Sequence, residues 1–334
     1  MTDIILISND QIYLEKKKLY ADFNDIINVI EAIQKNFNIL LISKKSKNKK
    51  NFLLKISNKI KNVNFKSILY LKRKKNLKII MISITPRNFF FFIIIKLLIG
   101  KIDGYVYLRS NGHKEYEKKI GLFGSFIYDF MKKYLENNLK TISVSKEIIS
   151  SKYTAFLTPS ELDQIWFKRG KKVSIDIPKL LYFGRFKREK GVYSLINLFS
   201  RLKLKHKLTI AGDSNFVGAN DENIQFLNEI TDKKKIIELY DAHNIFILPS
   251  YTEGAPKVIL ESLVRKIPVI IFKEIKHVKL NFKGIFVCDR NILSLEKNIK
   301  FIIKNYNKIQ LEMKKNNLPT KKNFQKQLLK ILNV

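Results

Sequence analysis

Two glutamates eight positions apart, Glu253 and Glu261, lie in the stretch PSYTEGAPKVILESL, residues 249–263. A strand-like apolar run precedes this stretch. Gly254 permits a sharp turn, and Pro256 suits the first position of a helix because no hydrogen bond is lost there. The start of such a helix offers free amide groups and the positive end of its dipole, which together can hold a phosphate. The pattern therefore predicts an anion-binding turn between the two glutamates.

Glu261 is surrounded in the sequence by apolar residues that suit a packed helix face. A carboxylate in such surroundings is costly unless hydrogen-bond donors reach it. We therefore interpret Glu261 as a ligand-binding group. A partly exposed glutamate on a surface helix is the alternative.

A second pattern, LLYFGRFKREKGVYSL, lies upstream. Leu180–Phe183 is typical of a buried strand that Gly184 ends, and a helix is predicted to start near residue 191. Arg185 and Lys190 then lie in a strand-to-helix loop, on the edge of a parallel sheet where ligands bind. Two cations facing a helix start can clamp a pyrophosphate, although ordinary solvated side chains in a very basic protein remain the alternative.

These segments resemble a known family, the retaining glycosyltransferases of the GT-B fold, specifically the large GT4-type group. The resemblance rests on GRFKREKG, on AGD at residues 211–213, on LPSYTEGAPKVILES, and on the spacing among them. It covers the C-terminal half well and the N-terminal half only in outline. It implies an α/β fold with two Rossmann-like domains facing each other across a cleft and a C-terminal helix crossing back to the first domain.

The resemblance also implies a role for each matched residue. Glu253 would contact the hexose, Glu261 would accept hydrogen bonds from the ribose, and Arg185 and Lys190 would stabilise the leaving diphosphate. The catalytic candidates are Glu253, Arg185 and Lys190, and the donor-binding candidates are Glu261, Gly184, Gly254, Ala255, Pro256 and Lys257. No Asp-x-Asp pair appears at a predicted strand end. We therefore expect no metal site and no cofactor, with a nucleotide-diphosphate sugar as the co-substrate.

The expected domains are an acceptor-binding domain at residues 1–170, a nucleotide-sugar-binding domain at 171–315 and a C-terminal helix at 316–334. In the second domain we predict strands at 180–183, 207–211, 223–227, 244–248, 268–272 and 284–288, and helices at 192–202, 233–241, around Glu261 and at 292–305. In the first domain we predict strands at 3–8, 38–43, 67–71, 77–83, 104–109 and 141–145, and helices at 22–35, 88–99 and 124–134.

Arg109, Asn111 and His113 follow a predicted strand of the first domain directly, in a glycine-containing loop. Such polar groups can line a cleft, so they are candidates for contact with the acceptor or the sugar, although His113 is more often an ordinary loop histidine. The family's glycine-rich turn after the first strand is replaced here by SNDQIYLEKKK. The resembling interdomain passage has Asp163 after Ser160-Glu161-Leu162, where the family has Asn-Gly.

Sixty-four Lys and Arg against 29 Asp and Glu give a net charge of +35. This charge favours polyanions, and we expect an anionic membrane surface rather than nucleic acid because no nucleic-acid motif accompanies it. Compositional drift towards lysine is the alternative. The apolar run at residues 89–100 is too short to span a bilayer and is predicted to be a core helix, with shallow membrane insertion as the alternative. The single cysteine excludes a disulfide framework.

The first ten residues lack a signal-peptide pattern, so we expect a cytoplasmic protein, with the cytoplasmic face of the inner membrane as the alternative location. The function expected from the resemblance is hexose transfer to a saccharide or lipid-linked acceptor in cell-envelope polysaccharide or lipopolysaccharide synthesis. Two other functions stay open. One is a GT-B nucleotide-sugar epimerase, and the other is a non-enzymatic, basic polyanion-binding protein with a degenerate transferase fold.

Overall fold

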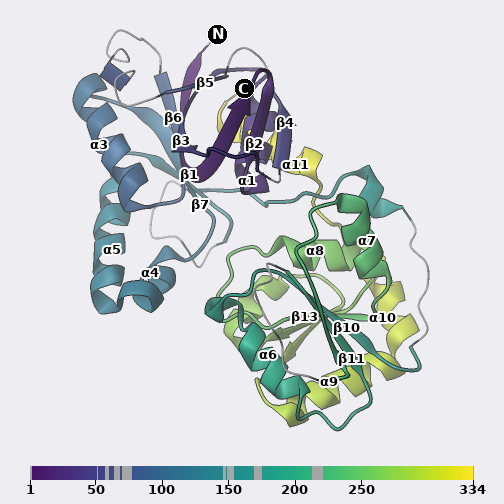
Figure 1. The fold of residues 1–334 in the computed structure, drawn as a ribbon. Coiled ribbons are helices and arrows are strands. Elements are labelled where there is room, and N and C mark those ends of the chain that lie inside the picture. The colour runs from purple at the N-terminus through teal and green to yellow at the C-terminus, as the bar shows by residue number, and fades with distance from the viewer. Residues whose placement is uncertain are drawn as a thin grey trace. The chain divides into compact units, whose positions relative to one another are not determined.

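The computed structural model describes residues 2–50, 52–56, 60–63, 68–69, 77–145, 148, 154–168, 175–212 and 221–333. The chain forms two compact units: Met1–Pro159 with Lys321–Val334, and Ser160–Thr320. Each unit has a parallel-rich sheet with helices, as predicted (Figure 1). The boundary expected at residue 170 lies inside the second unit, because residues 160–168 pack with that unit.

The second unit has a parallel sheet in the order β12-β11-β10-β13-β14-β15. Its strands are β10 (Lys179–Phe183), β11 (Lys207–Ala211), β12 (Ile224–Leu227), β13 (Ile245–Leu248), β14 (Val269–Phe272) and β15 (Ile285–Cys288). Its helices are α6 (Val192–Phe199), α7 (Lys233–Asp241), α8 (Lys257–Val264), α9 (Ile292–Lys304) and α10 (Tyr306–Met313), with 3-10 turns η3 (Gln164–Phe167), η4 (Arg188–Lys190) and η5 (Lys273–Lys279). Every residue of β13 and β14 is buried, as expected for parallel strands covered on both faces.

The first unit contains a mixed sheet in the order β4-β2-β1-β6-β7-β8-β9, with β3 paired to β1 and β5 paired to β3. Its strands are β1 (Asp3–Glu15), β2 (Lys18–Ala21), β3 (Asn38–Lys45), β4 (Phe52–Lys55), β5 (Ile60–Asn62), β6 (Leu77–Ile82), β7 (Asp103–Leu108), β8 (Lys140–Ser143) and β9 (Thr154–Phe156). Its helices are α1 (Asn24–Ile33), α3 (Pro86–Ile99), α4 (Gly112–Ile120), α5 (Leu122–Glu136) and α11 (Lys321–Ile331). The strand predicted at 67–71 falls largely outside the described residues.

Alternate residues of β1 build the two faces of this first sheet. Ile4 and Leu6 join the core with α1 and α11, whereas Ile5 and Ile7 join the core with α3 and α5. This alternation follows from the two-residue period of a strand. The core that contains Ile4 and Leu6 also contains Phe324, Leu328 and Leu332, so the C-terminal helix α11 packs on the first unit.

Two local predictions for the first unit were wrong. Strand β1 does not end at Ser8 but continues to Glu15 and forms a hairpin with β2, because IYLE and KLYA both carry strand-forming residues. The turn between them places Lys16 at φ +50°. The segment from Gly112 is not a loop but helix α4, because Asn111 caps its start by accepting a hydrogen bond from the Lys114 amide.

Candidate active site

Neighbouring strands β10 and β13 create the crevice on which the site is built. The chain leaves β10 through η4 into α6 and returns to β11, whereas it leaves β13 through residues 249–256 into α8 and returns to β14. The strand order therefore reverses between β10 and β13. In open α/β sheets, ligands bind at such a switch point, beyond the carboxyl ends of the strands.

One ion pair joins the two loops at this point. Lys190 Nζ lies 2.7 Å from Glu253 Oε1, and the Ser250 hydroxyl donates to the same oxygen at 2.6 Å. The two charged side chains are only 20% and 11% exposed, so water screens the pair little. His277 Nε2 also lies 2.9 Å from the Glu253 carbonyl oxygen. The structure therefore brings together the predicted residues Lys190 and Glu253, and fixes Glu253 from both sides.

Gly191 allows the two loops to approach. Its φ of +70° lies in the left-handed region, and an added Cβ would lie 2.0 Å from the Pro249 carbonyl oxygen. The Tyr251 amide donates to the Glu189 carbonyl at 2.9 Å, which joins the loops again one residue further on. A glycine after Lys190 is therefore a condition for the contact between Lys190 and Glu253.

Glu261 lies in the middle of α8 and receives a hydrogen bond of 2.9 Å from the Tyr240 hydroxyl. Burial, together with the nearby charge of Glu161, raises the pKa of the Glu261 carboxyl to about 7, while the hydrogen bond from Tyr240 acts in the opposite direction. Glu261 is thus poised to change charge near neutral pH. A hydroxyl group that donates a hydrogen bond to this carboxylate stabilises its charged form.

The start of α8 differs in detail from the expectation. Pro256 is the residue before the helix, with extended backbone, and the first helical residue is Lys257. The Lys257 ammonium contacts the Glu161 carboxylate, so it is held by a group that precedes η3 in the chain. Gly254 is buried and Ala255 is partly exposed. The left-handed glycine of this site is Gly191 rather than Gly254, which has no positive φ.

Arg185 is exposed in the loop after β10. The Tyr182 hydroxyl donates to the Arg185 carbonyl oxygen at 2.8 Å, and the Gly184 amide donates to the Ala211 carbonyl at 3.0 Å. These hydrogen bonds fix the backbone of residues 184 and 185, from which the Arg185 side chain extends. Of the AGD motif, Asp213 lies outside the described residues.

A pocket of about 550 Å³ opens between the two loops and is lined by Arg188, Gly191, Tyr193, Ser194 and Tyr251. The Arg290 guanidinium stacks on Tyr251, with 4.0 Å from its central carbon to the ring centre. It also donates to Glu274 at 2.6 Å. Arg290 thereby supports the pocket wall.

Sequence reasoning missed the residues that hold the predicted ones in place: Ser250, Tyr240, Glu161, His277 and Arg290. Ser250 lies inside the recognised motif and Glu161 at a recognised departure from the family pattern, so both carried a signal. Tyr240 lies on α7 and Arg290 follows β15, far from the motifs in sequence, and neither had a local signal.

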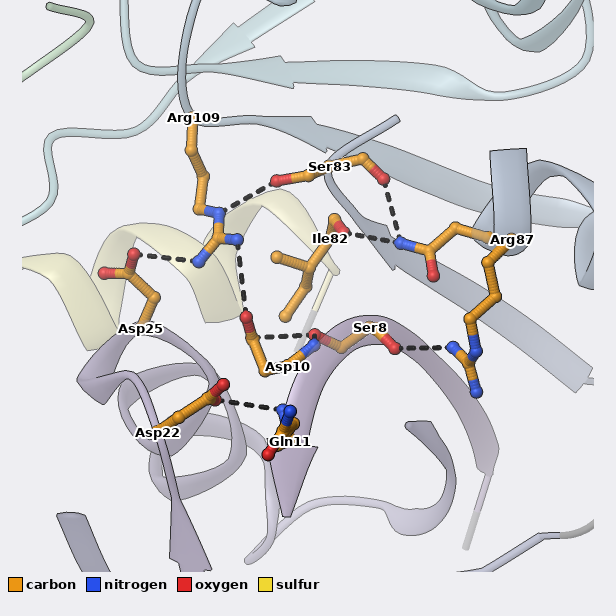
Figure 2. A network of polar contacts seen from close by, with 10 residues as sticks. Ser8, Asp10, Gln11, Asp22, Asp25, Ile82, Ser83, Arg87 and Arg109 are labelled. Atoms are coloured by element: carbon orange, nitrogen blue, oxygen red, sulfur yellow. Dashed lines mark hydrogen bonds and ion pairs between the residues drawn. The ribbon is translucent and has the colours of Figure 1, made fainter. Parts of the chain in front are cut away.

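In the first unit, Arg109 belongs to a polar network at the carboxyl ends of β6 and β7, beside the point where β1 stops pairing with β6 (Figure 2). Its guanidinium donates to Asp25 at 2.8 Å and to the Ser83 hydroxyl at 3.0 Å, and lies 3.7 Å from Asp10. Burial raises the pKa of the Asp10 carboxyl, although the Arg109 charge and the Ser8 hydroxyl act in the opposite direction. The network fixes Arg109 at the sheet edge where ligands bind in such folds.

The other two candidates of the first unit do not belong to this network. Asn111 caps α4, and His113 Nδ1 lies 2.8 Å from Asp129 on α5 in an exposed ion pair. Asn111 thus stabilises the start of α4, and His113 links α4 to α5. Arg109 is the candidate that the structure places among buried polar groups.

Residues 164–318 match the model of the family described as glycosyl transferases group 1. The matched range contains both loops of the site, the ion pair between Lys190 and Glu253, and all of α8. The match confirms the predicted resemblance to group 1 glycosyltransferases.

Among curated proteins, the chain is 30% identical over 90 residues to TuaC of Bacillus subtilis (strain 168), a glycosyltransferase provisionally assigned to teichuronic acid biosynthesis. The alignment covers 27% of this chain and 23% of TuaC. The chain spans less than half the length of the curated relatives it matches.

Two solved structures are similar over the whole chain. Sucrose-phosphate synthase of Thermosynechococcus elongatus has a TM-score of 0.74 at 13% identity, covering 100% of this chain and 98% of that one. Anabaena Alr3699/HepE, solved in complex with UDP-glucose, has a TM-score of 0.69 at 12% identity and covers 100% of both chains. These similarities confirm the predicted GT-B fold.

Within the described residues, no group of three or more His, Cys, Asp or Glu side chains is arranged to hold a metal ion. Across the same part of the chain, every helix is too short or too polar to cross a membrane.

Proposed function

We propose that the chain is a retaining glycosyltransferase that moves a hexose from a nucleotide-diphosphate sugar to a saccharide or lipid-linked acceptor. The observation that carries this proposal is the ion pair of Lys190 and Glu253 at the switch point of a unit that matches the family model of group 1 glycosyltransferases. The complex of HepE with UDP-glucose supports a nucleotide sugar as the donor. The assignment of TuaC to teichuronic acid biosynthesis supports a role in making cell-envelope polysaccharide, which we extend to lipopolysaccharide as the alternative product.

In this proposal the second unit binds the donor and the first unit binds the acceptor. Transfer breaks the bond between the anomeric carbon and the diphosphate, so negative charge develops on the leaving group. Lys190, Arg185 and the amide groups at the start of α8 stabilise that charge, and no metal ion is required. The fixed position of Lys190 matters because preorganised cations need no rearrangement during the reaction.

Glu253 contacts the hexose hydroxyls through the carboxylate that Ser250 and Lys190 hold, and Glu261 accepts hydrogen bonds from the ribose hydroxyls. The acceptor hydroxyl attacks the anomeric carbon from the face that the diphosphate leaves and gives its proton to the departing diphosphate oxygen, so the anomeric configuration is retained. On the acceptor side, Arg109 is the proposed contact, because Asp25 and Ser83 fix its guanidinium at the carboxyl edge of the first sheet.

A hydrolysis assay with a panel of nucleotide sugars tests the donor site without a known acceptor, because water can replace the acceptor. We expect Lys190→Ala and Arg185→Ala each to lower turnover of the preferred donor at least about tenfold, a loss of about 1.4 kcal/mol or more in transition-state stabilisation. Lys187→Ala is the matched control, since Lys187 is an exposed lysine of the same loop.

Turnover by Lys190→Ala and Arg185→Ala at the level of the wild type would refute the site. The assay is run with EDTA and with magnesium, and equal rates are expected because the proposed charge stabilisation uses protein groups. The anomeric configuration of the freshly released sugar, read by NMR before it mutarotates, tests retention. Release of an epimerised sugar would instead support the epimerase alternative.

A further inference from the structure

Helix α5 of the first unit is apolar on two opposite sides. Its inward side is buried at Tyr128, Met131 and Leu135 and belongs to the core of the unit. Its outward side carries Phe123, Phe126 and Phe130, spaced three and four residues apart, and all three are largely exposed. Helix α5 therefore exposes a stripe of aromatic side chains away from the core of the unit.

Helix α3 extends the same surface. It packs beside α5 through ring contacts of Phe89 with Phe130 and Tyr134, at 6.3 Å and 5.5 Å between ring centres. Figure 1 shows α3 and α5 along the same side of the first unit, with α4 next to α5. We call the exposed large side chains of these helices the apolar face. The apolar face consists of Phe90, Leu97, Ile120, Leu122, Phe123, Phe126 and Phe130, each at least 55% exposed.

Most soluble proteins expose large apolar side chains singly, whereas this face gathers seven of them on adjoining helices. Their positions are also regular, because Phe90 and Leu97 are two helical turns apart on α3 and the three phenylalanines follow one stripe on α5. Such a face marks an interaction surface.

The charges around this face are mostly positive. Residues 86–140 contain ten Lys and Arg against five Asp and Glu. Exposed Lys133 continues the stripe of Phe126 and Phe130 on α5, where its long stem can lie on an apolar surface while its ammonium reaches a polar layer. The negative charge of Asp129 on α5 is paired with His113.

We propose that the apolar face docks on the surface of an anionic lipid bilayer, with the phenylalanines in the outer acyl region and the lysines at the head groups. Apolar burial and attraction to acidic lipids act together in such interfacial binding. A second copy of the chain fits less well, because two chains that each carry +35 repel one another. Helices α3 and α5, of 14 and 15 residues, are too short to span the bilayer and lie on it instead.

Vesicle flotation of the full chain tests this proposal, with phosphatidylcholine vesicles and with vesicles containing about 30% phosphatidylglycerol, an anionic content chosen to mimic an acidic membrane. We expect binding to the anionic vesicles. Phe123→Ser/Phe126→Ser/Phe130→Ser should weaken this binding at least about tenfold, because removal of three buried rings costs well over 1.4 kcal/mol.

Leu293→Ser/Phe301→Ser/Leu311→Ser is the matched control, because it removes three similarly exposed apolar side chains from the second unit. It should bind like the wild type. Lys133→Glu should weaken binding to anionic vesicles and leave any binding to phosphatidylcholine unchanged. Far-UV circular dichroism and thermal unfolding of both triple variants check that both units are folded.

Three results would overturn the proposal. The first is no binding to anionic vesicles at low salt. The second is binding that the triple phenylalanine variant retains in full, which would mean that lysines elsewhere suffice. The third is a dimer of the wild type, measured by mass photometry, that the triple phenylalanine variant converts to a monomer while vesicle binding is absent.

Discussion

Replacement of Glu261 by glutamine should make the protein more stable above neutral pH. The ordinary pKa of a glutamate is 4.5, and burial raises that of Glu261 to about 7 in the folded chain. The folded state therefore favours the protonated carboxyl. The stability that this preference contributes is complete below pH 4.5 and is lost as the pH rises to 7 and beyond.

The size of this loss of stability follows from the difference between the two pKa values of Glu261, 4.5 and about 7. At 1.36 kcal/mol per pH unit, the ionised Glu261 lowers the free energy of unfolding by about 3 kcal/mol at pH 8.5 relative to pH 4.5. Glu261→Gln keeps an acceptor for the Tyr240 hydroxyl but does not ionise. The stability of this variant relative to the wild type should therefore rise by up to about 3 kcal/mol across this pH range.

Urea unfolding followed by tryptophan fluorescence measures this difference within the correct unit. Trp166 is the single tryptophan of the chain, is buried in the second unit and has its ring centre 5.9 Å from that of Tyr240. Glu238→Gln, at an exposed position of α7, is the control and should shift stability equally at both pH values. A free-energy difference between Glu261→Gln and the wild type that is the same at pH 5 and pH 8.5 would refute the reasoning.

Three further substitutions test how the site is held. Gly191→Ala should destabilise the protein by about 2–4 kcal/mol in urea unfolding, because it adds left-handed strain to a clash with a backbone carbonyl; an unchanged urea midpoint would contradict the loop geometry. Arg265→Ala should cost about 3–5 kcal/mol by the same measurement, since it removes the 2.7 Å pair with Asp241 from a guanidinium side chain that is 3% exposed; a loss below 1 kcal/mol would show that the pair is not strongly coupled. Tyr240→Phe should lower stability by about 1.5–3 kcal/mol at pH 8.5 and by less at pH 5, because the hydroxyl stabilises ionised Glu261; equal losses at the two pH values would argue against this role.

The sequence predicted the second unit to within a few residues at nearly every strand and helix. Its strands are continuous apolar runs bounded by Gly, Pro and polar residues, so the local signal was strong. Strand β11 and helix α7 have the predicted bounds. The sequence placed Lys190 and Glu253 in two loops at one edge of a parallel sheet, but their ion pair was not predicted.

The first unit was predicted less well because its departures depend on pairing between segments. The extension of β1 to Glu15 needs β2 as its partner, and α4 begins at a cap that looks like a loop in sequence. The supports of the site were missed for a related reason, since Tyr240 and Glu161 reach Glu261 and Lys257 only after the chain has folded.

The apolar face illustrates another limit of sequence reasoning. The run at residues 89–100 was predicted to be a core helix, and Phe92 and Ile95 are indeed buried. Phe90 and Leu97 of the same helix are exposed, because a helix apolar all round has more apolar surface than one sheet can cover. The hydrophobic pattern gave no means of choosing which side would remain open.

Isothermal titration of the full chain with UDP, GDP, ADP, CMP and the corresponding sugar nucleotides tests the central claim most directly. We expect one nucleoside diphosphate and its sugar to bind, and Glu261→Gln and Lys190→Ala each to weaken that binding at least about tenfold, or about 1.4 kcal/mol. Lys187→Ala should bind like the wild type. Failure of the folded wild type to bind any of these nucleotides, together with salt-sensitive binding to nucleic acid, would contradict the account and support a polyanion-binding protein.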